Sequence, residues 1–581
     1  MGEGRLIVVD RVERLRGRQA DDVAGAVVAG HTAAEFYTNR TVVHLMTEML
    51  DVQPGESVYD PTCGSGGMLL SCIAHLRNQK KEWRNVKLYG QERNLMTSSI
   101  ARMNCFLHGI EDFRIERGDT LAEPKLVEGD RLQRFDVVLA NPPYSIKQWD
   151  RDAFASDPWG RNVFGVPPQG RADYAFQQHI LQSLRPKTGR CAVLWPHGVL
   201  FRGGKEKLIR EMFIQDDVLE AIISLPPGLF YGTGIPACIL VLDKENAAAR
   251  KGVMMIDASK GFIKDGNKNR LREQDLHRIV DVFQKMADVP GYARMVPLSE
   301  IASDKNDYNL NLPRYIDSSE PEDIQDLSAH LNGGIPDRDL FGGGSTLAPY
   351  WQIMPTLRAT LFKPLRESYS QLQQPVAEVK AAILSHAEFT AFQATATQLF
   401  ADWQARNEPR MKDLKVGDQP KAFIEALSED LLATFKPAPL VDAYSVYQHL
   451  MDYWAEAMQD DAYAVAQDGW VAKPARIIET DKKGKKKDKG WACDLVPKTV
   501  VVVRYFAAQQ AALDAEQSKL DATSSAITEL EEEHSGDDAI FAGYDKINAA
   551  AVKDRIREIK AELQPSQPPD ENSALELKVL N

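Results

Sequence analysis

The residues best suited to chemistry form the tetrapeptide Asn141-Pro142-Pro143-Tyr144. Its prolines fix the backbone φ angle and remove two N–H donors, which leaves a stiff turn rich in carbonyl acceptors. The Asn141 side-chain oxygen and the Pro142 carbonyl can each accept one N–H of an amine on an aromatic ring, and stabilise the positive charge that develops when this nitrogen is alkylated. Tyr144 offers a ring on which a flipped-out base can stack. Alone, such a tetrapeptide is also a common turn.

A strand should present this tetrapeptide, because the apolar run Phe135–Ala140 ends directly before it. From residue 57 to about 257, short runs rich in Val, Ile and Leu alternate with longer amphipathic stretches. Such runs are typical of buried parallel strands, and the stretches between them of crossover helices. We predict a doubly wound, mostly parallel α/β sheet whose ligands lie outside the carboxyl ends of its strands. The predicted strands are Ser57–Asp60, Lys87–Gln91, Phe135–Ala140, Cys191–Trp195, Ala221–Leu225 and Cys238–Leu242.

A glycine-rich turn, Pro61-Thr62-Cys63-Gly64-Ser65-Gly66-Gly67, follows the first of these strands. Its glycines let the backbone turn tightly and approach a ligand with no Cβ in the way. The spacing is not that of nicotinamide enzymes, and no ribose-binding acid stands ~20 residues further on. Instead Glu92 ends the next strand, where it could accept both hydroxyls of a ribose, and Asp119 ends a third, where it could accept an adenine amino group. A tight turn beside two exposed acids is the alternative, which their order along one βαβαβ unit disfavours.

The composition is ordinary for a globular protein of two or three domains, with 581 residues, 44% hydrophobic and 26% charged. No apolar run approaches the ~20 residues that cross a bilayer, and residues 1–21 show no signal-peptide pattern. The six cysteines are scattered and the eleven histidines lack ligand spacing, so we expect a cytoplasmic protein without a metal site. The net charge of −13 argues against a self-sufficient binder of duplex DNA, whose affinity would depend on Lys and Arg.

Beyond about residue 317 the pattern is mainly helical, and two segments stand out. An apolar residue recurs every seven positions at Phe506, Leu513, Leu520 and Ile527, which predicts one stripe on a helix. The marks of a second helix are Ile547, Val552, Ile556, Ile559 and Leu563. A hairpin packed on its own domain and a partner-binding coiled coil are both open interpretations. The polar, Pro-rich stretch from about 564 predicts disorder.

Three further features have an ordinary structural explanation beside a functional one. The basic run Lys482-Lys483-Gly484-Lys485-Lys486-Lys487-Asp488-Lys489 is either a solvated loop or a contact to phosphate. Cys63 lies in the glycine turn, but nothing nearby in the sequence would act as a base for its thiol. His179 and His197 are interpreted as structural, because alkyl transfer to an amine needs no imidazole.

The order of these motifs resembles that of the amino-methyltransferases, and more closely that of the modification subunits of type I restriction-modification systems. The resemblance covers residues 34 to about 315 well, and the helical tail is similar in kind but less diagnostic. The motifs that carry it are Glu35-Phe36-Tyr37-Thr38, the run from Asp60 to Gly67, Asn141-Pro142-Pro143-Tyr144, Ala172-Asp173-Tyr174-Ala175-Phe176, Gly232-Thr233-Gly234-Ile235-Pro236, Asn269-Arg270-Leu271-Arg272 and Tyr308-Asn309-Leu310-Asn311.

The resemblance implies a site-specific adenine-N6 DNA methyltransferase with the class I S-adenosylmethionine-dependent fold. Asn141, Pro142, Pro143 and Tyr144 would be its catalytic residues. Phe230 would be the second ring that, with Tyr144, sandwiches the target base. The segment 36–38 would line the methionine half of the cofactor. The residues expected to bind S-adenosylmethionine are Phe36, Tyr37, Thr38, Asp60, Gly64, Ser65, Gly66, Glu92 and Asp119.

The resemblance also implies partners. Two modification subunits would surround one specificity subunit, which reads the DNA sequence, and the restriction subunit can join them. We expect three regions: a short segment over 1–33 in place of the helical domain that relatives carry, a methyltransferase domain over 34–316, and a helical, partner-binding region over 317–581. A second departure is Asn39, which stands where relatives usually have Pro.

Other functions share the tetrapeptide. It also serves enzymes that methylate glutamine amide nitrogen in proteins, guanine N2 in RNA or cytosine N4 in DNA. The first two are expected to be shorter and to lack a long helical tail, whereas cytosine N4 stays open on chemical grounds. A non-catalytic scaffold that keeps the fold is a further alternative, which the intact Asn141–Tyr144 and Gly64–Gly67 disfavour.

Overall fold

The computed structural model describes residues 38–562, apart from 217, 231–233, 235, 246, 267, 319–324, 481–485, 494, 497 and 534–548. The chain divides into two compact units. One comprises Met1–Asp413 with Asp418–Gln459, and the other Leu414–Gly417 with Asp460–Asn581. Among the described residues, no helix combines the length and the apolar character needed to cross a membrane.

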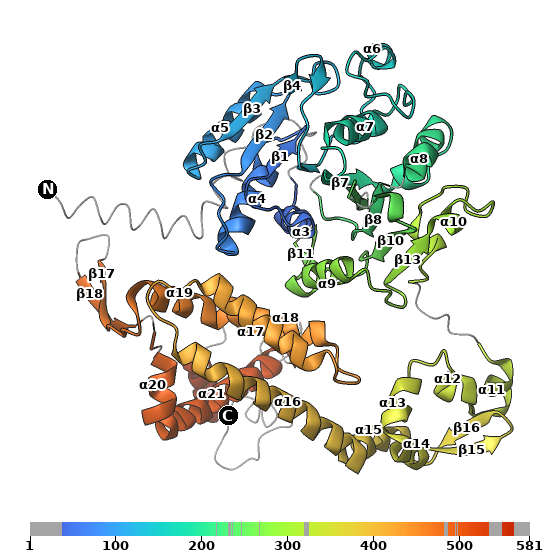
Figure 1. Cartoon of the computed structure of the whole chain (residues 1–581). Coiled ribbons are helices and arrows are strands. Elements are labelled where there is room, and N and C mark those ends of the chain that lie inside the picture. The colour runs from blue at the N-terminus through green and yellow to red at the C-terminus, as the bar shows by residue number, and fades with distance from the viewer. Residues whose placement is uncertain are drawn as a thin grey trace. The chain divides into compact units, whose positions relative to one another are not determined.

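The first unit is built around nine strands: β1 (Ser57–Asp60), β2 (Lys87–Glu92), β3 (Phe113–Arg117), β6 (Val137–Ala140), β7 (Arg190–Pro196), β8 (Leu219–Ser224), β9 (Ala237–Asp243), β10 (Gly252–Asp257) and β13 (Ala293–Pro297). They form one sheet in the order β13-β10-β8-β9-β7-β6-β1-β2-β3 (Figure 1). Neighbours pair in parallel from β3 through to β7, and again between β8 and β10. β9 is antiparallel to both its neighbours, and β13 is antiparallel to β10.

The predicted mostly parallel sheet is confirmed, with one correction. We predict Cys238–Leu242 as a parallel strand, but this run is the centre of β9 and lies antiparallel to β7 and β8. A parallel neighbour needs a crossover of a dozen or more residues, usually a helix. The connection from β8 to β9 contains no helix among its described residues, so β9 returns beside β8 in the opposite direction. The predicted strand over 135–140 is shorter than expected, because β6 begins at Val137.

Helices cover both faces of this sheet, because strand residues alternate between two cores. In β6, Val137 and Leu139 join one core, while Val138 and Ala140 join the other. The first core also takes side chains from α3 (Arg40–Leu50), α4 (Gly67–Asn78), α5 (Leu95–Leu107) and α9 (Glu273–Lys285). The second takes them from α7 (Asp173–Ser183) and α8 (Lys205–Gln215). A strand buried on both faces has this period of two, and the doubly wound fold is confirmed.

The rest of the first unit is mainly helical, with a three-stranded sheet in the order β14-β16-β15. Its elements are α11 (Leu327–Asn332), β14 (Ile335–Pro336), α12 (Asp337–Phe341), α13 (Ala348–Ile353), α14 (Pro355–Leu361), β15 (Phe362–Arg366), β16 (Tyr369–Leu372), α15 (Val376–Ser385), α16 (Ala387–Lys412), α17 (Pro420–Phe435) and α18 (Ala443–Tyr453). Shorter elements near the large sheet are β4 (Val127–Glu128), β5 (Arg131–Leu132), α6 (Arg151–Ala155), β11 (Ile263–Asp265), β12 (Lys268–Arg270) and α10 (Leu298–Ile301).

The pair α17 and α18 packs against α9 through polar contacts. His277 of α9 bonds with Glu429, and Asp281 bonds with Lys436 Nζ at 2.8 Å and with the Tyr444 hydroxyl. These bonds join residues on either side of the predicted domain boundary at 316. The α17–α18 part of the helical region therefore belongs to the same compact unit as the large sheet.

The second unit carries a two-stranded hairpin and the helix with the predicted stripe. Its elements are α19 (Gln459–Asp468), β17 (Ala475–Thr480), β18 (Lys486–Ala492), α20 (Lys498–Tyr505), α21 (Ala507–Glu533) and α22 (Ala549–Glu562). Helices α20 and α21 meet at Phe506, whose amide bonds to Val502 O at 2.7 Å, so helical bonding continues through the junction. Leu513, Leu520 and Ile527 are 63%, 62% and 51% exposed, so the described part of this unit does not bury the stripe.

The second predicted helix corresponds to α22. Ile559 is buried, while Ile547 and Leu563 lie outside the described residues, as does the stretch from 564 that we predict to be disordered.

Candidate active site

The predicted site residues meet at one edge of the large sheet. Asp60 ends β1 and Glu92 ends β2, its parallel neighbour. Asp119 follows β3, and Asn141 follows β6, which pairs with β1 on its other side. Parallel strands end at a common edge of the sheet. The polar residues that follow these strands in the sequence therefore lie along one edge in the structure.

The glycine-rich turn is tied to β2 through its backbone. Gly64 has φ +52° and Gly66 has φ +83°, values that side chains with a Cβ rarely adopt. The Gly64 amide donates to Glu92 Oε2 at 3.0 Å, and the Asn94 amide donates to Glu92 Oε1 at 2.8 Å. Asn94 is also the N-cap of α5. One carboxylate thus joins the turn after β1 to the start of α5, and is itself held in one orientation.

The two left-handed glycines face different surroundings. A Cβ at Gly64 would meet no atom within 4 Å, whereas a Cβ at Gly66 would touch the Ala101 Cβ of α5 at 3.5 Å. The 3.5 Å separation at Gly66 is an ordinary van der Waals contact, so the surroundings of Gly66 are closer than those of Gly64. Both glycines keep the left-handed backbone of the turn, and both stay in the set predicted to bind the cofactor.

Asp60 lies buried at the start of the turn. The residue is 2% exposed, and its Oδ1 accepts the Thr62 amide at 3.0 Å. Burial raises the pKa of Asp60 to about 7. The negative charge of Glu92 raises this pKa further, whereas the hydrogen bond from the Thr62 amide lowers it. A positive charge nearby would stabilise the ionised carboxylates of Asp60 and Glu92. This part of the site therefore suits a cationic ligand.

Asp119 lies in a loop that is also fixed to the turn. Its Oδ1 accepts the Leu121 amide at 3.0 Å, and Arg93 lies 3.6 Å from its Oδ2. The hydroxyl of Thr120 donates to the Pro61 carbonyl at 2.5 Å. The predicted partner of an adenine amino group therefore sits beside the glycine-rich turn, with 39% of its side chain exposed.

Asn141 is oriented by a residue from before β1. Its Nδ2 donates to Thr38 Oγ1 at 2.8 Å. Its Oδ1 is buried and has no hydrogen-bond partner among the described residues. A buried polar atom without a partner costs free energy, so this oxygen is suited to a ligand that donates to it. That is the role predicted for it.

Two aromatic rings of the predicted site pack on one core. Phe230 is 4% exposed within the first core, and the partly buried Tyr144 packs against the same cluster. Burial raises the pKa of the Tyr144 hydroxyl, which therefore stays protonated. The loop before Phe230 is held by Asn39, whose Nδ2 donates to the Leu229 carbonyl at 3.3 Å. Phe36 and Tyr37 lie outside the described residues.

Asn39, where the resemblance leads us to expect Pro, also bonds to its own helix. Its Oδ1 accepts the Thr41 amide at 3.0 Å and caps α3. A Pro at this position could make neither of the two side-chain bonds of Asn39, although it would make the backbone more rigid.

The cysteine, the histidines and the basic run discussed from the sequence lie in surroundings that give them no evident part in the chemistry. Burial raises the pKa of the Cys63 thiol well above its usual value, which opposes a nucleophilic role. His179 Nε2 contacts the Tyr59 hydroxyl at 3.0 Å, and His197 Nε2 the Ala237 carbonyl at 3.0 Å. Within the described residues no cluster of His, Cys, Asp or Glu could hold a metal. Of the basic run, the described lysines are exposed on β18 and are Lys486, Lys487 and Lys489.

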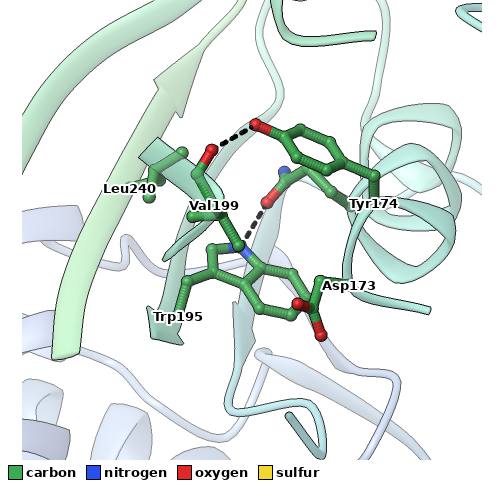
Figure 2. A pocket seen from close by; sticks show the side chains of 6 residues that line it. Asp173, Tyr174, Trp195, Val199 and Leu240 are labelled. Atoms are coloured by element: carbon green, nitrogen blue, oxygen red, sulfur yellow. Dashed lines mark hydrogen bonds between the residues drawn. The ribbon is translucent and has the colours of Figure 1, made fainter. Parts of the chain in front are cut away.

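A pocket under the start of α7 holds none of the predicted site residues (Figure 2). Its walls are joined by two bonds, from the Tyr174 hydroxyl to the Val199 carbonyl at 2.8 Å and from Trp195 Nε1 to Gln177 Oε1 at 2.6 Å. Asp173 and Leu240 complete its lining.

One neighbour of the tetrapeptide was not predicted. Asp173 accepts the amide of Ser145, the residue after Tyr144, at 2.6 Å. Asp173 stands in one of the motifs that carry the resemblance, but an acid at the start of a helix is ordinary. No signal in the sequence connects it with position 145.

A mostly parallel sheet with an antiparallel strand inserted between two parallel ones, as β9 is between β7 and β8, and with ligand motifs along its carboxyl edge, is the fold of the class I S-adenosylmethionine-dependent methyltransferases. This chain has that fold. Within that class, the chain belongs to the N-6 DNA methylase family, whose model matches residues 24–324.

Its relatives include methylase subunits of type I restriction enzymes. The MjaVII subunit of Methanocaldococcus jannaschii is 37% identical over 309 residues, 51% of this chain and 52% of that protein. The HindI subunit of Haemophilus influenzae is 33% identical over 308 residues, 51% of this chain and 67% of that protein. The match thus spans about half the length of the first of these relatives. A solved type I methyltransferase subunit from Streptococcus thermophilus is 35% identical, with a TM-score of 0.46, over 49% of this chain and 60% of that one.

Proposed function

We propose that this chain transfers the methyl group of S-adenosylmethionine to adenine N6 in duplex DNA, as the modification subunit of a type I restriction-modification complex. The observation that carries the proposal is the buried Asn141 Oδ1, which has no hydrogen-bond partner among the described residues. An amino group on a flipped-out base would complete it. Membership of the N-6 DNA methylase family and the names of the relatives support this choice of substrate.

The turn and its carboxylates fit the cofactor. S-adenosylmethionine supplies a methyl group on a positively charged sulfur and also carries an ammonium group. Asp60 and Glu92 offer the negative charge that suits such a cation, and Gly64 leaves space beside the turn. Glu92 would accept the ribose hydroxyls and Asp119 the adenine amino group. The further residues assigned to the cofactor are Phe36, Tyr37, Thr38, Ser65 and Gly66.

The tetrapeptide would hold the target amine. Asn141 Oδ1 would accept one N–H and the Pro142 carbonyl the other, which favours a pyramidal nitrogen whose lone pair can attack the methyl group in line. The positive charge that forms on nitrogen is stabilised by the same oxygens, and one proton then leaves to solvent. Tyr144 would stack on the base. Phe230, which is 4% exposed, would be the second ring against the base.

Partners would supply what this chain lacks. Its net charge of −13 is unfavourable for binding duplex DNA alone. The exposed stripe on α21 offers an apolar surface to the long helices of a specificity subunit, with two copies of this chain for each such subunit. The restriction subunit would join that assembly, and the cytoplasm is the expected location.

The test compares DNA from host cells with and without the gene, and from cells that carry Asn141→Ala or the exposed control Asn332→Ala. Nucleoside mass spectrometry should find N6-methyladenine with the natural gene and the control, and lose it without the gene and with Asn141→Ala. N4-methylcytosine in its place would favour the cytosine alternative. Equal modification in the presence and absence of the gene would refute both, and would leave the scaffold interpretation.

A further inference from the structure

The residue that follows the catalytic tetrapeptide has an unusual backbone. Ser145 has φ +52°, in the left-handed region that residues other than glycine enter rarely and at a cost. Such strain persists only where the surroundings over-determine it, and it is concentrated at functional sites. Since Ser145 directly follows Tyr144, whatever holds its backbone also sets the direction in which the tetrapeptide leaves the sheet.

A buried carboxylate holds this residue. The Ser145 amide donates to Asp173 Oδ1 at 2.6 Å, and its hydroxyl to Asp173 Oδ2 at 3.3 Å. The Asp173 side chain is 1% exposed and begins α7, where the helix dipole favours a negative charge. Hydrogen bonds to an ionised acceptor are the strong kind, so this contact can oppose the strain at Ser145.

An arginine completes the arrangement. Arg202 Nη1 donates to Asp173 Oδ2 at 2.6 Å, and Nη2 lies 3.4 Å from the Ser145 hydroxyl. Arg202 thus compensates the buried carboxylate, which would otherwise be costly. Its place is prepared by Gly198, because a Cβ there would overlap the Arg202 guanidinium.

The backbone that carries Arg202 is itself fixed to two helices. The buried Arg210 of α8 donates to the Arg202 carbonyl at 3.0 Å and to the Val199 carbonyl at 3.1 Å. From α7, the Tyr174 hydroxyl reaches the same Val199 carbonyl, as Figure 2 shows. These bonds fix the backbone of residues 199–202. They therefore also fix the position from which Arg202 bonds to Asp173.

We infer that Arg202 and Asp173 are positioning residues that clamp Ser145 and thereby place the ring of Tyr144 for the target base. The inference rests on the proposed function for its substrate, but the clamp is a property of the chain by itself. With Thr38 bonded to Asn141 at one end and Asp173 bonded to Ser145 at the other, the tetrapeptide is held on both sides.

The test uses Arg202→Gln and Asp173→Asn in the full-length chain, purified with its partners. The controls are Arg338→Gln, which removes an arginine from a more exposed ion pair, and Asp337→Asn, which like Asp173 is the first residue of a helix. Hydrogen exchange of the peptide 141–147, calorimetric binding of S-adenosylmethionine, and the transfer rate on unmethylated host DNA are measured for each. Arg202→Gln is included because Arg202 is partly exposed, so its replacement disturbs the fold less than a change at the buried Asp173.

Both clamp variants should speed exchange of the Ser145 amide at least tenfold and slow transfer at least tenfold, with cofactor affinity changed by less than twofold. The double variant should be no slower than the slower single one, because both act through the same contact. Arg202→Gln with natural exchange and natural transfer would overturn the clamp, and so would a loss of cofactor binding equal to the loss of transfer. If the unaltered protein methylates no DNA, the proposed function fails, while the exchange measurement still tests the clamp.

Discussion

The Asn141 amide nitrogen donates to Thr38 Oγ1 at 2.8 Å, and this bond decides which end of the Asn141 side chain is left for a ligand. The two residues are 103 positions apart in the sequence. Thr38 belongs to the segment expected to line the cofactor, so one hydroxyl connects the cofactor side of the site with the group that would accept the target amine.

Thr38→Val should keep the shape of residue 38 and remove its hydroxyl. Without this acceptor the Asn141 amide can turn, and methyl transfer should fall about tenfold, the effect of about 1.4 kcal/mol expected for one hydrogen bond. The rate on host DNA at saturating S-adenosylmethionine measures it. Thr38→Ser is the control and should keep most of the rate, and an undiminished rate for Thr38→Val would show that the bond does not orient Asn141.

Asp60 should make cofactor binding depend on pH. Its pKa is raised to about 7 by burial, and a cationic ligand prefers the ionised form. Affinity for S-adenosylmethionine should therefore rise about tenfold from pH 6 to pH 8, with uptake of the ligand releasing a proton. Calorimetry in buffers of different ionisation enthalpy measures both quantities.

The same carboxylate should lower the stability of the ligand-free chain. A raised pKa in the folded state means that the contribution of Asp60 to stability is present below its unfolded pKa and is lost as the pH rises through about 7. Asp60→Asn should thus raise the melting temperature at pH 8 and weaken cofactor binding. Equal pH profiles of binding in the natural chain and in Asp60→Asn would contradict both expectations.

The two left-handed glycines should respond differently to substitution. Gly64→Ala places a Cβ in the open space where the cofactor is expected, so it should reduce the affinity for S-adenosylmethionine. It should lower the melting temperature only by the effect of backbone strain, because the Cβ meets no other atom. Gly66→Ala has the less favourable backbone, with φ +83°, and its Cβ would lie in ordinary contact with Ala101 at 3.5 Å, so backbone strain should mainly destabilise the fold. Calorimetry and thermal unfolding are measured side by side, and the pair of assignments fails if the two variants behave alike.

The sheet could be predicted because each buried strand leaves a compact apolar run. The direction of β9 could not, because a run such as Cys238–Leu242 has the same pattern in either direction and only its connection to β8 decides. The site motifs were predicted from residue types at strand ends. The bond between Thr38 and Asn141 and the clamp at Ser145 join distant positions, and their residues look ordinary where they stand.

The stripe on α21 provides a test of assembly. Leu513→Asp with Leu520→Asp should prevent association with the specificity subunit, because a charge cannot be buried cheaply in an apolar contact. The matched control is Ala515→Asp with Ala522→Asp, which has the same spacing on the opposite side of the helix. Complex mass and cofactor binding are measured for both. If the Leu513 and Leu520 variant assembles normally, the stripe takes no part in binding the specificity subunit.

The contact of α17 and α18 with α9 combines a ring contact between His277 and Tyr447 with ion pairs and hydrogen bonds, such as those of Asp281 with Lys436 and Tyr444. Water and salt ions can replace contacts of this kind more readily than they can replace a buried apolar seam. Raising the ionic strength should therefore weaken the contact between α9 and the pair α17 and α18, while the apolar cores on the two faces of the sheet stay intact.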